Sequence, residues 1–273
     1  MANRALLVGI NAYPTQPLLG CVNDIVDSAQ FLIQKCGFAD ADIWHLTDAD
    51  ATADAIRERI ASWLVAPAQA GDRICFHYSG HGARLNYTDG AVHDVICPVD
   101  FAFSAPRAIA DFEFAGLFAG LPQGVRFNWI SDSCHSGDLA LLTTTLLDSP
   151  RRGIAKILEP PAAVASAIQA LLAAGAPQTR LRSAAQGLNG ALIAACRSDQ
   201  LSFDSVFDGR PNGVLTHYLL ERLAAADGLG RSLTAAVADA SASIQAAHWG
   251  QSPQLHGSPG ICAAGFLGGA AGV

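Results

Sequence analysis

The sequence lacks the features of membrane, secreted and nucleic-acid-binding proteins. Its 273 residues contain no run of about 18 apolar residues, which a spanning helix needs, and no N-terminal signal for secretion. The seven cysteines are odd in number and irregularly spaced, which argues against a disulfide framework and for a reducing compartment. Charged residues are few, 15%, and the net charge of −7 disfavours nucleic acid or anionic membrane as a partner. We therefore expect a soluble, cytoplasmic protein.

The chain is rich in apolar residues, and their spacing follows the periods of strands and helices. Apolar residues make up 51% of it, enough for one large domain or two small ones. Strand-like apolar runs alternate with helical patterns, which predicts an α/β fold with a mostly parallel sheet between two helical layers. The expected strands lie at 4–10, 43–46, 72–80, 125–133, 191–195 and near Ile261, and the expected helices at 53–64, 111–119, 162–175, 212–226 and 232–247.

Two other local expectations concern loops and caps. Asn23 and Asp24 precede a helical pattern and are cap residues by type. The stretch 83–92 is polar and rich in turn residues, which predicts a loop at the rim of the sheet.

Two strand ends carry reactive side chains. Cys134 follows the apolar run 125–130 within a Ser/Gly-rich turn, and His81 follows the run 73–80 in the same way. Parallel neighbouring strands bring their carboxyl ends to one edge of a sheet, where α/β folds place their chemistry. A thiol beside an imidazole is the minimal equipment for nucleophilic cysteine catalysis, with the amides of small neighbouring residues available for an oxyanion.

Each of these residues also has a simpler interpretation. A single Cys or His is more often a core or surface residue than a catalytic one. His135, His77 and Cys75 suggest a metal cluster, but no Cys-x-x-Cys or His-x-x-x-His pair completes a tetrahedral zinc set. Asp132 could simply be a buried carboxylate satisfied by backbone amides.

The stretches around His81 and Cys134 resemble two sequence motifs, or boxes, of a known family. Tyr78-Ser-Gly-His-Gly82 and Asp132-Ser-Cys-His-Ser-Gly137 are similar to the His and Cys boxes of caspase-like cysteine peptidases, in particular the prokaryotic-type metacaspases without a prodomain. Cys134 follows His81 by 53 residues, close to the roughly 50 of caspases, although the local cysteine signature differs from theirs. Further landmarks in the same order lie at 5–13, 20–24, 96–100, 198–204 and 251–255.

That resemblance implies a fold and an activity. The fold is the three-layer αβα caspase type with a central, mostly parallel six-stranded sheet, and the activity is endopeptidase cleavage after Arg or Lys. His81 is then the general base and acid, Cys134 the nucleophile, and the amides of Gly82 and Cys134 the oxyanion site. Cys21, Asp24, Ser79 and Asp132 map onto the acidic specificity pocket. Paired buried carboxylates do favour a cationic side chain and penalise an acidic one.

Calcium activation is common among metacaspases of this type, but the site here looks incomplete. Asp94 and Asp111 resemble two of the ligands, whereas Phe112 and Leu141 stand where further acidic residues are usual. Calcium takes about six to eight oxygen ligands. We expect no required cofactor and weak or absent calcium dependence.

The resemblance also suggests a division of the chain into regions of one caspase-like domain, 1–273. Residues 1–138 correspond to a large subunit with both boxes, 139–189 to a linker or insert, and 190–273 to a small subunit. If the enzyme activates itself by cutting, basic residues of the linker are the expected sites, with ordinary solvated charges as the alternative: Arg151, Arg152, Lys156, Arg180 and Arg182.

The expected partners are protein or peptide substrates with basic residues, and by resemblance the chain is a monomer. One alternative is a catalytically silent scaffold of the same fold that binds a partner, for which the apolar helix 162–175 is a candidate surface. Another is a cysteine-dependent amidase or transferase with the same dyad, which would leave the acidic pocket without a role.

Overall fold

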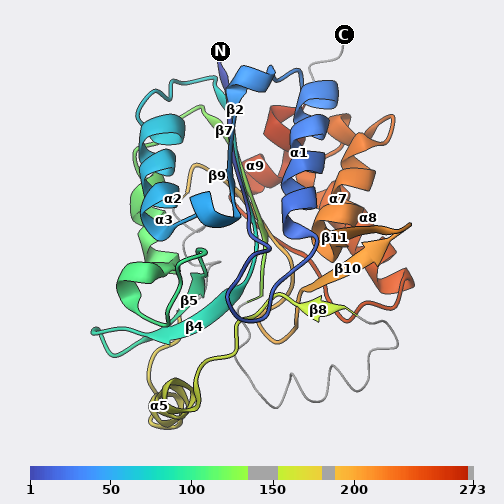
Figure 1. Ribbon diagram of the computed structural model, residues 1–273. Coiled ribbons are helices and arrows are strands. Elements are labelled where there is room, and N and C mark those ends of the chain that lie inside the picture. Colours follow the sequence, from blue (N-terminus) through green and yellow to red (C-terminus); the bar gives the residue numbers. More distant parts are fainter. Residues whose placement is uncertain (135–152, 180–187, 270–273) are drawn as a thin grey trace.

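A six-stranded sheet forms the centre of the molecule (Figure 1). The structure is a computed structural model that describes residues 1–134, 153–179 and 188–269. The strand order is β12-β9-β7-β3-β1-β2, and every neighbouring pair is parallel except β12 with β9. The α/β class with a mostly parallel six-stranded sheet is therefore confirmed. The strands are β1 (Asn3–Gly9), β2 (Ile43–Thr47), β3 (Arg73–Ser79), β7 (Arg126–Asp132), β9 (Gly190–Ala194) and β12 (Gln254–His256).

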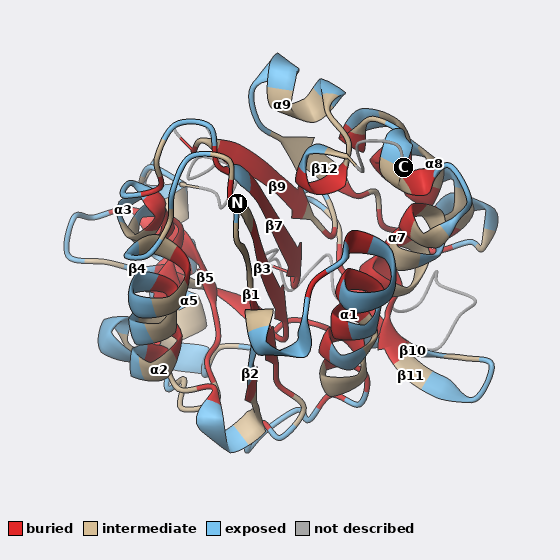
Figure 2. Cartoon of the chain, turned by 90° about the horizontal axis from the view of Figure 1, so that it is seen from above, coloured by how far each residue is buried: buried red, intermediate tan, exposed pale blue. Residues whose placement is uncertain are grey.

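Helices cover both faces of this sheet and complete three layers (Figure 2). On one face lie α2 (Ala53–Arg59), which continues as π-helical turns over Ile60–Val65, and α3 (Asp111–Phe118). On the other lie α1 (Cys21–Cys36), α7 (Val214–Ala224) and α8 (Leu233–Ala246). The continuous apolar runs of the central strands follow from this, because both of their faces are buried.

Smaller elements gather beyond the carboxyl ends of the parallel strands, at the lower edge in Figure 1. One three-stranded sheet consists of β4 (Gly82–Asn86), β5 (Val92–Ile96) and β6 (Ile109–Ala110). A second consists of β8 (Ile154–Ala155), β10 (Phe203–Phe207) and β11 (Arg210–Gly213). Helix α5 (Ala162–Ala173) lies at the same edge. No helix within the described ranges is long and apolar enough to cross a membrane.

Three local predictions were wrong. The stretch 83–92 is largely the β4–β5 hairpin, in which Ala83 and Leu85 are buried while Asn86 is exposed. The alternation of inward and outward side chains, which favours a strand, therefore outweighs the turn-forming residues. Ile261 lies in a short helix, α9 (Pro259–Ala263), capped by Ser258, and the last strand is β12. Asp24 is not a cap: α1 starts at Cys21, and the carboxylate of Asp24 points into the site described next.

Candidate active site

Strand register brings the two sequence boxes together. Ser79 and Asp132 are paired neighbours at the ends of β3 and β7, and His81 and Cys134 each follow two residues later. The main-chain amides of Gly82 and Cys134 donate hydrogen bonds of 3.0 and 3.1 Å to one oxygen, the carbonyl of Lys156. Two amides aimed at one oxygen have the geometry of an oxyanion site.

His81 is held in one orientation by the loop that follows β1. Its Nε2 lies 2.7 Å from the carbonyl oxygen of Gln16. Because a carbonyl only accepts, Nε2 carries the hydrogen, and Nδ1 is the unprotonated nitrogen, with no hydrogen-bond partner among the described residues. Burial lowers the pKa of His81 to about 4, although the bond to Gln16 opposes the shift. The imidazole is therefore neutral and able to accept a proton at Nδ1.

Cys134 is buried, and its Sγ donates to the carbonyl oxygen of Gln200 at 3.3 Å. The Sγ of Cys196 donates to the same oxygen at 3.4 Å. A hydrogen bond with Cys134 and burial raise the pKa of Cys196 well above its ordinary value, so Cys196 is a thiol rather than a thiolate.

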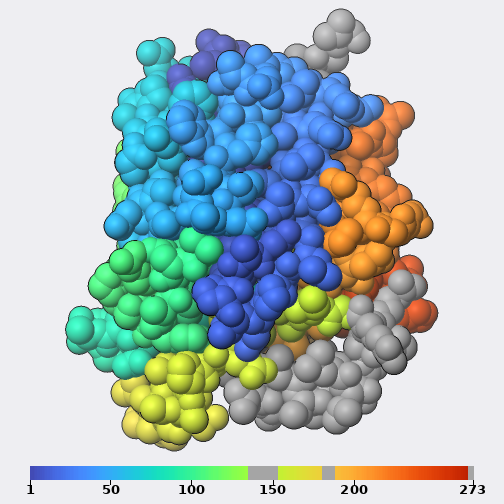
Figure 3. All heavy atoms as spheres, in the orientation of Figure 1, coloured from blue at the N-terminus to red at the C-terminus, as the bar shows by residue number. Residues whose placement is uncertain are grey.

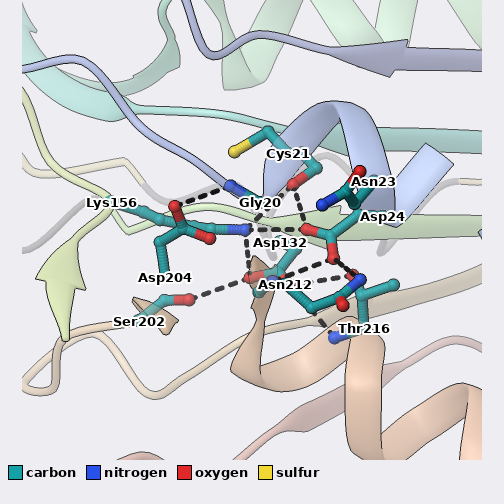
Figure 4. A network of polar contacts seen from close by, with 12 residues as sticks. Gly20, Cys21, Asn23, Asp24, Asp132, Lys156, Ser202, Asp204, Asn212 and Thr216 are labelled. Carbon is teal, nitrogen blue, oxygen red and sulfur yellow. Dashed lines mark hydrogen bonds and ion pairs between the residues drawn. The ribbon is translucent and has the colours of Figure 1, made fainter. Parts of the chain in front are cut away.

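The acidic pocket contains a lysine of the same chain (Figure 4). The Nζ of Lys156 lies 3.2 Å from Asp24 Oδ2, 3.2 Å from Asp132 Oδ1 and 2.9 Å from Ser79 Oγ. All four side chains are fully buried. Burial alone would lower the pKa of Lys156, but Asp132, Cys21 and Asp24 raise it well above its usual value, so the ammonium keeps its charge.

The two carboxylates of the pocket are positioned by separate parts of the chain. Asp24 Oδ1 accepts from the amide of Gly213 at 2.8 Å, and Asp132 Oδ2 accepts from the amide and hydroxyl of Thr216 at 3.0 and 2.8 Å. Burial raises the pKa of Asp24 to about 6 against the effect of Lys156. Burial also acts to raise the pKa of Asp132, but Lys156 and Thr216 outweigh it and hold that pKa below its usual value.

The segment around Lys156 is held at the site by main-chain hydrogen bonds on two sides. Its amide donates to the carbonyl of Ser202 at 2.9 Å, and the amide of Leu158 donates to the carbonyl of Gly82 at 3.0 Å. Strand β8, just before Lys156, pairs antiparallel with β10. In Figure 3 this yellow-green segment lies against the dark blue loop that follows β1. A peptide bound by strand addition, with a basic side chain in a pocket, makes this set of contacts.

Asp24, Ser79 and Asp132, three of the four residues that the resemblance assigned to the acidic pocket, contact Lys156. Cys21 is buried at the start of α1 and contributes to the field on Lys156. Sequence reasoning missed five further contributors. Ser202 and Asp204 lie in a landmark stretch that could have directed attention to them, whereas nothing in the sequence marks the others: Ser202, Asp204, Asn212, Gly213 and Thr216.

The zinc alternative finds no support among the described residues. His77 hydrogen-bonds through its ring to the hydroxyls of Ser28 and Thr216, at 2.9 and 3.3 Å, and Cys75 lies in an apolar core. No group of three or more His, Cys, Asp or Glu side chains in the described ranges is arranged to hold a metal ion. His135 lies outside them.

The two calcium candidates face cationic or potentially cationic side chains. Asp94 lies 3.5 Å from Arg84 Nε, and Asp111 Oδ1 lies 2.8 Å from Nδ1 of His93. Leu141 falls in the part of the chain that the structure leaves undescribed, as do four of the five basic linker residues: Arg151, Arg152, Arg180 and Arg182.

Comparisons with known proteins agree on one family. Residues 3–143 match the family model of the metacaspase, peptidase C14 domain. Metacaspase-7 of Arabidopsis thaliana is 40% identical over 146 residues, 51% of this chain and 36% of that protein. Metacaspase-1 of Schizosaccharomyces pombe is 38% identical over 144 residues, 49% of this chain and 34% of that protein. The matched region thus spans about a third of these curated relatives.

A solved structure extends the likeness of the fold. Protein GSU0716 of Geobacter sulfurreducens superimposes with a TM-score of 0.72 over 98% of this chain and 99% of that one, at 22% sequence identity. Together with the matched family model, this similarity shows the caspase-like fold.

Proposed function

Because the chain belongs to the metacaspase family of peptidase C14 domains, we propose that it is a cysteine endopeptidase that cleaves after Arg or Lys. Lys156 supports this proposal most directly. Its ammonium lies between two buried carboxylates, while its carbonyl oxygen accepts from the amides of Gly82 and Cys134. A buried ammonium without such partners would cost several kcal/mol, so the pocket selects cationic side chains.

The site residues have the following roles in the proposed reaction. Nδ1 of His81 takes the proton of Cys134, and the thiolate attacks the main-chain carbonyl carbon of the basic residue. The amides of Gly82 and Cys134 stabilise the resulting oxyanion, each commonly worth about 3 kcal/mol. His81 then gives its proton to the leaving amine, and water hydrolyses the thioester with His81 again as the base.

The test compares fluorogenic peptides with Arg, Lys, Asp or Leu at the cleaved position. We expect turnover of the Arg and Lys peptides by the unmodified protein and by Cys262→Ala, a partly buried cysteine remote from the site, but none by Cys134→Ala. Preference for the Asp peptide would refute the role of the pocket. Absence of turnover both in the unmodified protein and in Lys156→Ala, which frees the pocket, would refute a peptidase and favour a binding protein of the same fold.

The position of Lys156 also makes the Lys156–Ile157 bond the proposed site of self-cleavage. Its carbonyl already occupies the oxyanion site, and Ile157 and Leu158 are buried next to it, at 3% and 4% exposure. Incubation of the unmodified protein should yield two fragments, one that ends at Lys156 and one that begins at Ile157. Lys156→Ala should abolish this cut, and Lys35→Ala, which removes the other lysine of the chain, should not. A single unchanged mass in active enzyme would contradict the assignment.

A further inference from the structure

A third carboxylate borders the acidic pocket. Asp204 lies opposite Ile154 in the antiparallel pair of β10 with β8. Lys156 follows β8 directly, and its amide continues the contact between the two segments by donating to the carbonyl of Ser202 at 2.9 Å. Asp204 is 2% exposed, and its charge acts on Lys156 together with those of Asp24 and Asp132. In Figure 4, Asp204 is drawn beside the stem of the Lys156 side chain, and Asp24 lies beyond its nitrogen.

The two oxygens of Asp204 have different surroundings. Oδ2 accepts hydrogen bonds from the amides of Leu19 and Gly20 at 2.6 and 2.9 Å, which ties β10 to the start of α1. Oδ1 is buried and has no hydrogen-bond partner among the residues that the structure describes. A buried acceptor left without a donor is unfavourable, which indicates that something other than lysine completes the pocket.

Donor counting identifies that group. The lysine ammonium has three N–H bonds, and it has three neighbours, Asp24, Asp132 and Ser79. An arginine guanidinium has five N–H donors in a planar fork and reaches one bond further. After the same three acceptors are used, two N–H groups remain, and they need a further acceptor in a fully buried site.

We propose that Asp204 is a specificity-determining residue that makes the pocket prefer arginine over lysine, because its free Oδ1 accepts a guanidinium N–H. This inference rests on the proposed peptidase function and deepens it. Charge alone would favour both basic side chains, whereas the number and spread of the acceptors favour the forked one.

The test is the ratio of kcat/KM for two peptides that differ only in Arg or Lys at the cleaved position. In the unmodified protein we expect arginine to be preferred at least tenfold. Asp204→Asn keeps one oxygen for the amides of Leu19 and Gly20 and places an NH2 group where Oδ1 was. The ratio should then fall at least tenfold, mainly through KM of the Arg peptide. Asp208→Asn, an exposed change in the adjoining turn, should leave it unchanged.

Each outcome decides a separate point. A ratio near one in the unmodified protein overturns the inference even if Asp204→Asn does not fold, and so does an unchanged ratio in a folded Asp204→Asn. Cleavage of neither peptide, with or without Lys156→Ala, removes the proposed function itself. Cleavage of both at equal rates leaves that function in place and removes only the role of Asp204.

Discussion

The main-chain amide of Gly213 donates a hydrogen bond of 2.8 Å to Oδ1 of Asp24, so β11 both holds this carboxylate and forms a wall of the acidic pocket. A Cβ at Gly213 would overlap Nζ of Lys156 and Oδ2 of Asp132 and would lie 2.7 Å from Asp24 Oδ2. The absence of a side chain at this position is what leaves room for a cation between the two carboxylates.

Gly213→Ala should therefore close the pocket to basic side chains. We expect kcat/KM for Arg and Lys peptides to fall at least 100-fold, because a methyl group occupies the space of the bound cation. Gly116→Ala is the matched control, since a Cβ at this helical position meets nothing within 4 Å. Retained turnover in a folded Gly213→Ala would show that the cation binds elsewhere.

Tyr13 should support catalysis through the position of His81. Its hydroxyl accepts from the amide of His81 at 3.0 Å and donates to the carbonyl of Cys97 at 2.9 Å, and its ring lies 4.5 Å from the imidazole. Tyr13→Phe keeps the ring and leaves the buried amide unsatisfied, at a cost of about 1–3 kcal/mol. We expect kcat to fall about tenfold with KM nearly constant.

Tyr87→Phe is the control for this change. The Tyr87 hydroxyl is also buried, but it has no hydrogen-bond partner among the described residues, so its removal leaves no group unsatisfied. Steady-state kinetics and thermal unfolding of the two variants separate the effects. Equal kcat values for the two variants would argue against a positioning role for Tyr13.

Acid should destabilise the fold through His77. Burial lowers its pKa to about 4, from 6.5 in the unfolded chain. Between these values the unfolded state binds a proton that the folded state does not, so stability falls as the pH falls through this window. From pH 7 to 5 the expected loss is about 2 kcal/mol from this residue, and His81, whose pKa burial also lowers to about 4, adds a similar loss. Asp24, with its pKa raised to about 6, opposes the trend, because its folded form binds the extra proton.

Denaturant unfolding at pH 7, 6 and 5 measures this dependence. His77→Gln, which can still hydrogen-bond to Ser28 and Thr216, should lose about 2 kcal/mol less stability between pH 7 and 5 than the unmodified protein does. His248→Asn, at an exposed position with positive φ that Asn tolerates, should not. The same loss in all three proteins would assign the acid sensitivity to other groups.

Calcium should have little effect on activity. Asp94 and Asp111 already have Arg84 and His93 as neighbours, so calcium would have to displace those contacts. We expect addition of calcium to chelator-treated enzyme to change kcat/KM less than twofold. Strong activation would show that ligands beyond these residues complete a site, and isothermal titration would then detect binding.

The sequence determined the architecture and the chemistry of this protein. Apolar runs that end in Ser/Gly-rich turns at His81 and Cys134 identified two buried parallel strands and the reactive groups at their ends, because burial on both faces and turn chemistry are local properties of the chain. The acidic pocket of Asp24, Ser79 and Asp132 was expected only through the resemblance of those stretches to the metacaspases.

Tertiary structure alone decided what surrounds that pocket. Nothing in the local sequence places Lys156 or Gly213 in the pocket, and Asp204 lies only in a landmark stretch. All three reach the site because β8, β10 and β11 pair beyond the sheet edge. Asp24 had the pattern of a helix cap, yet long-range contacts with Lys156 and Gly213 give it a different role. Pairing between distant segments depends on the whole packed chain, so the acceptor count that favours arginine could be read only from the folded protein.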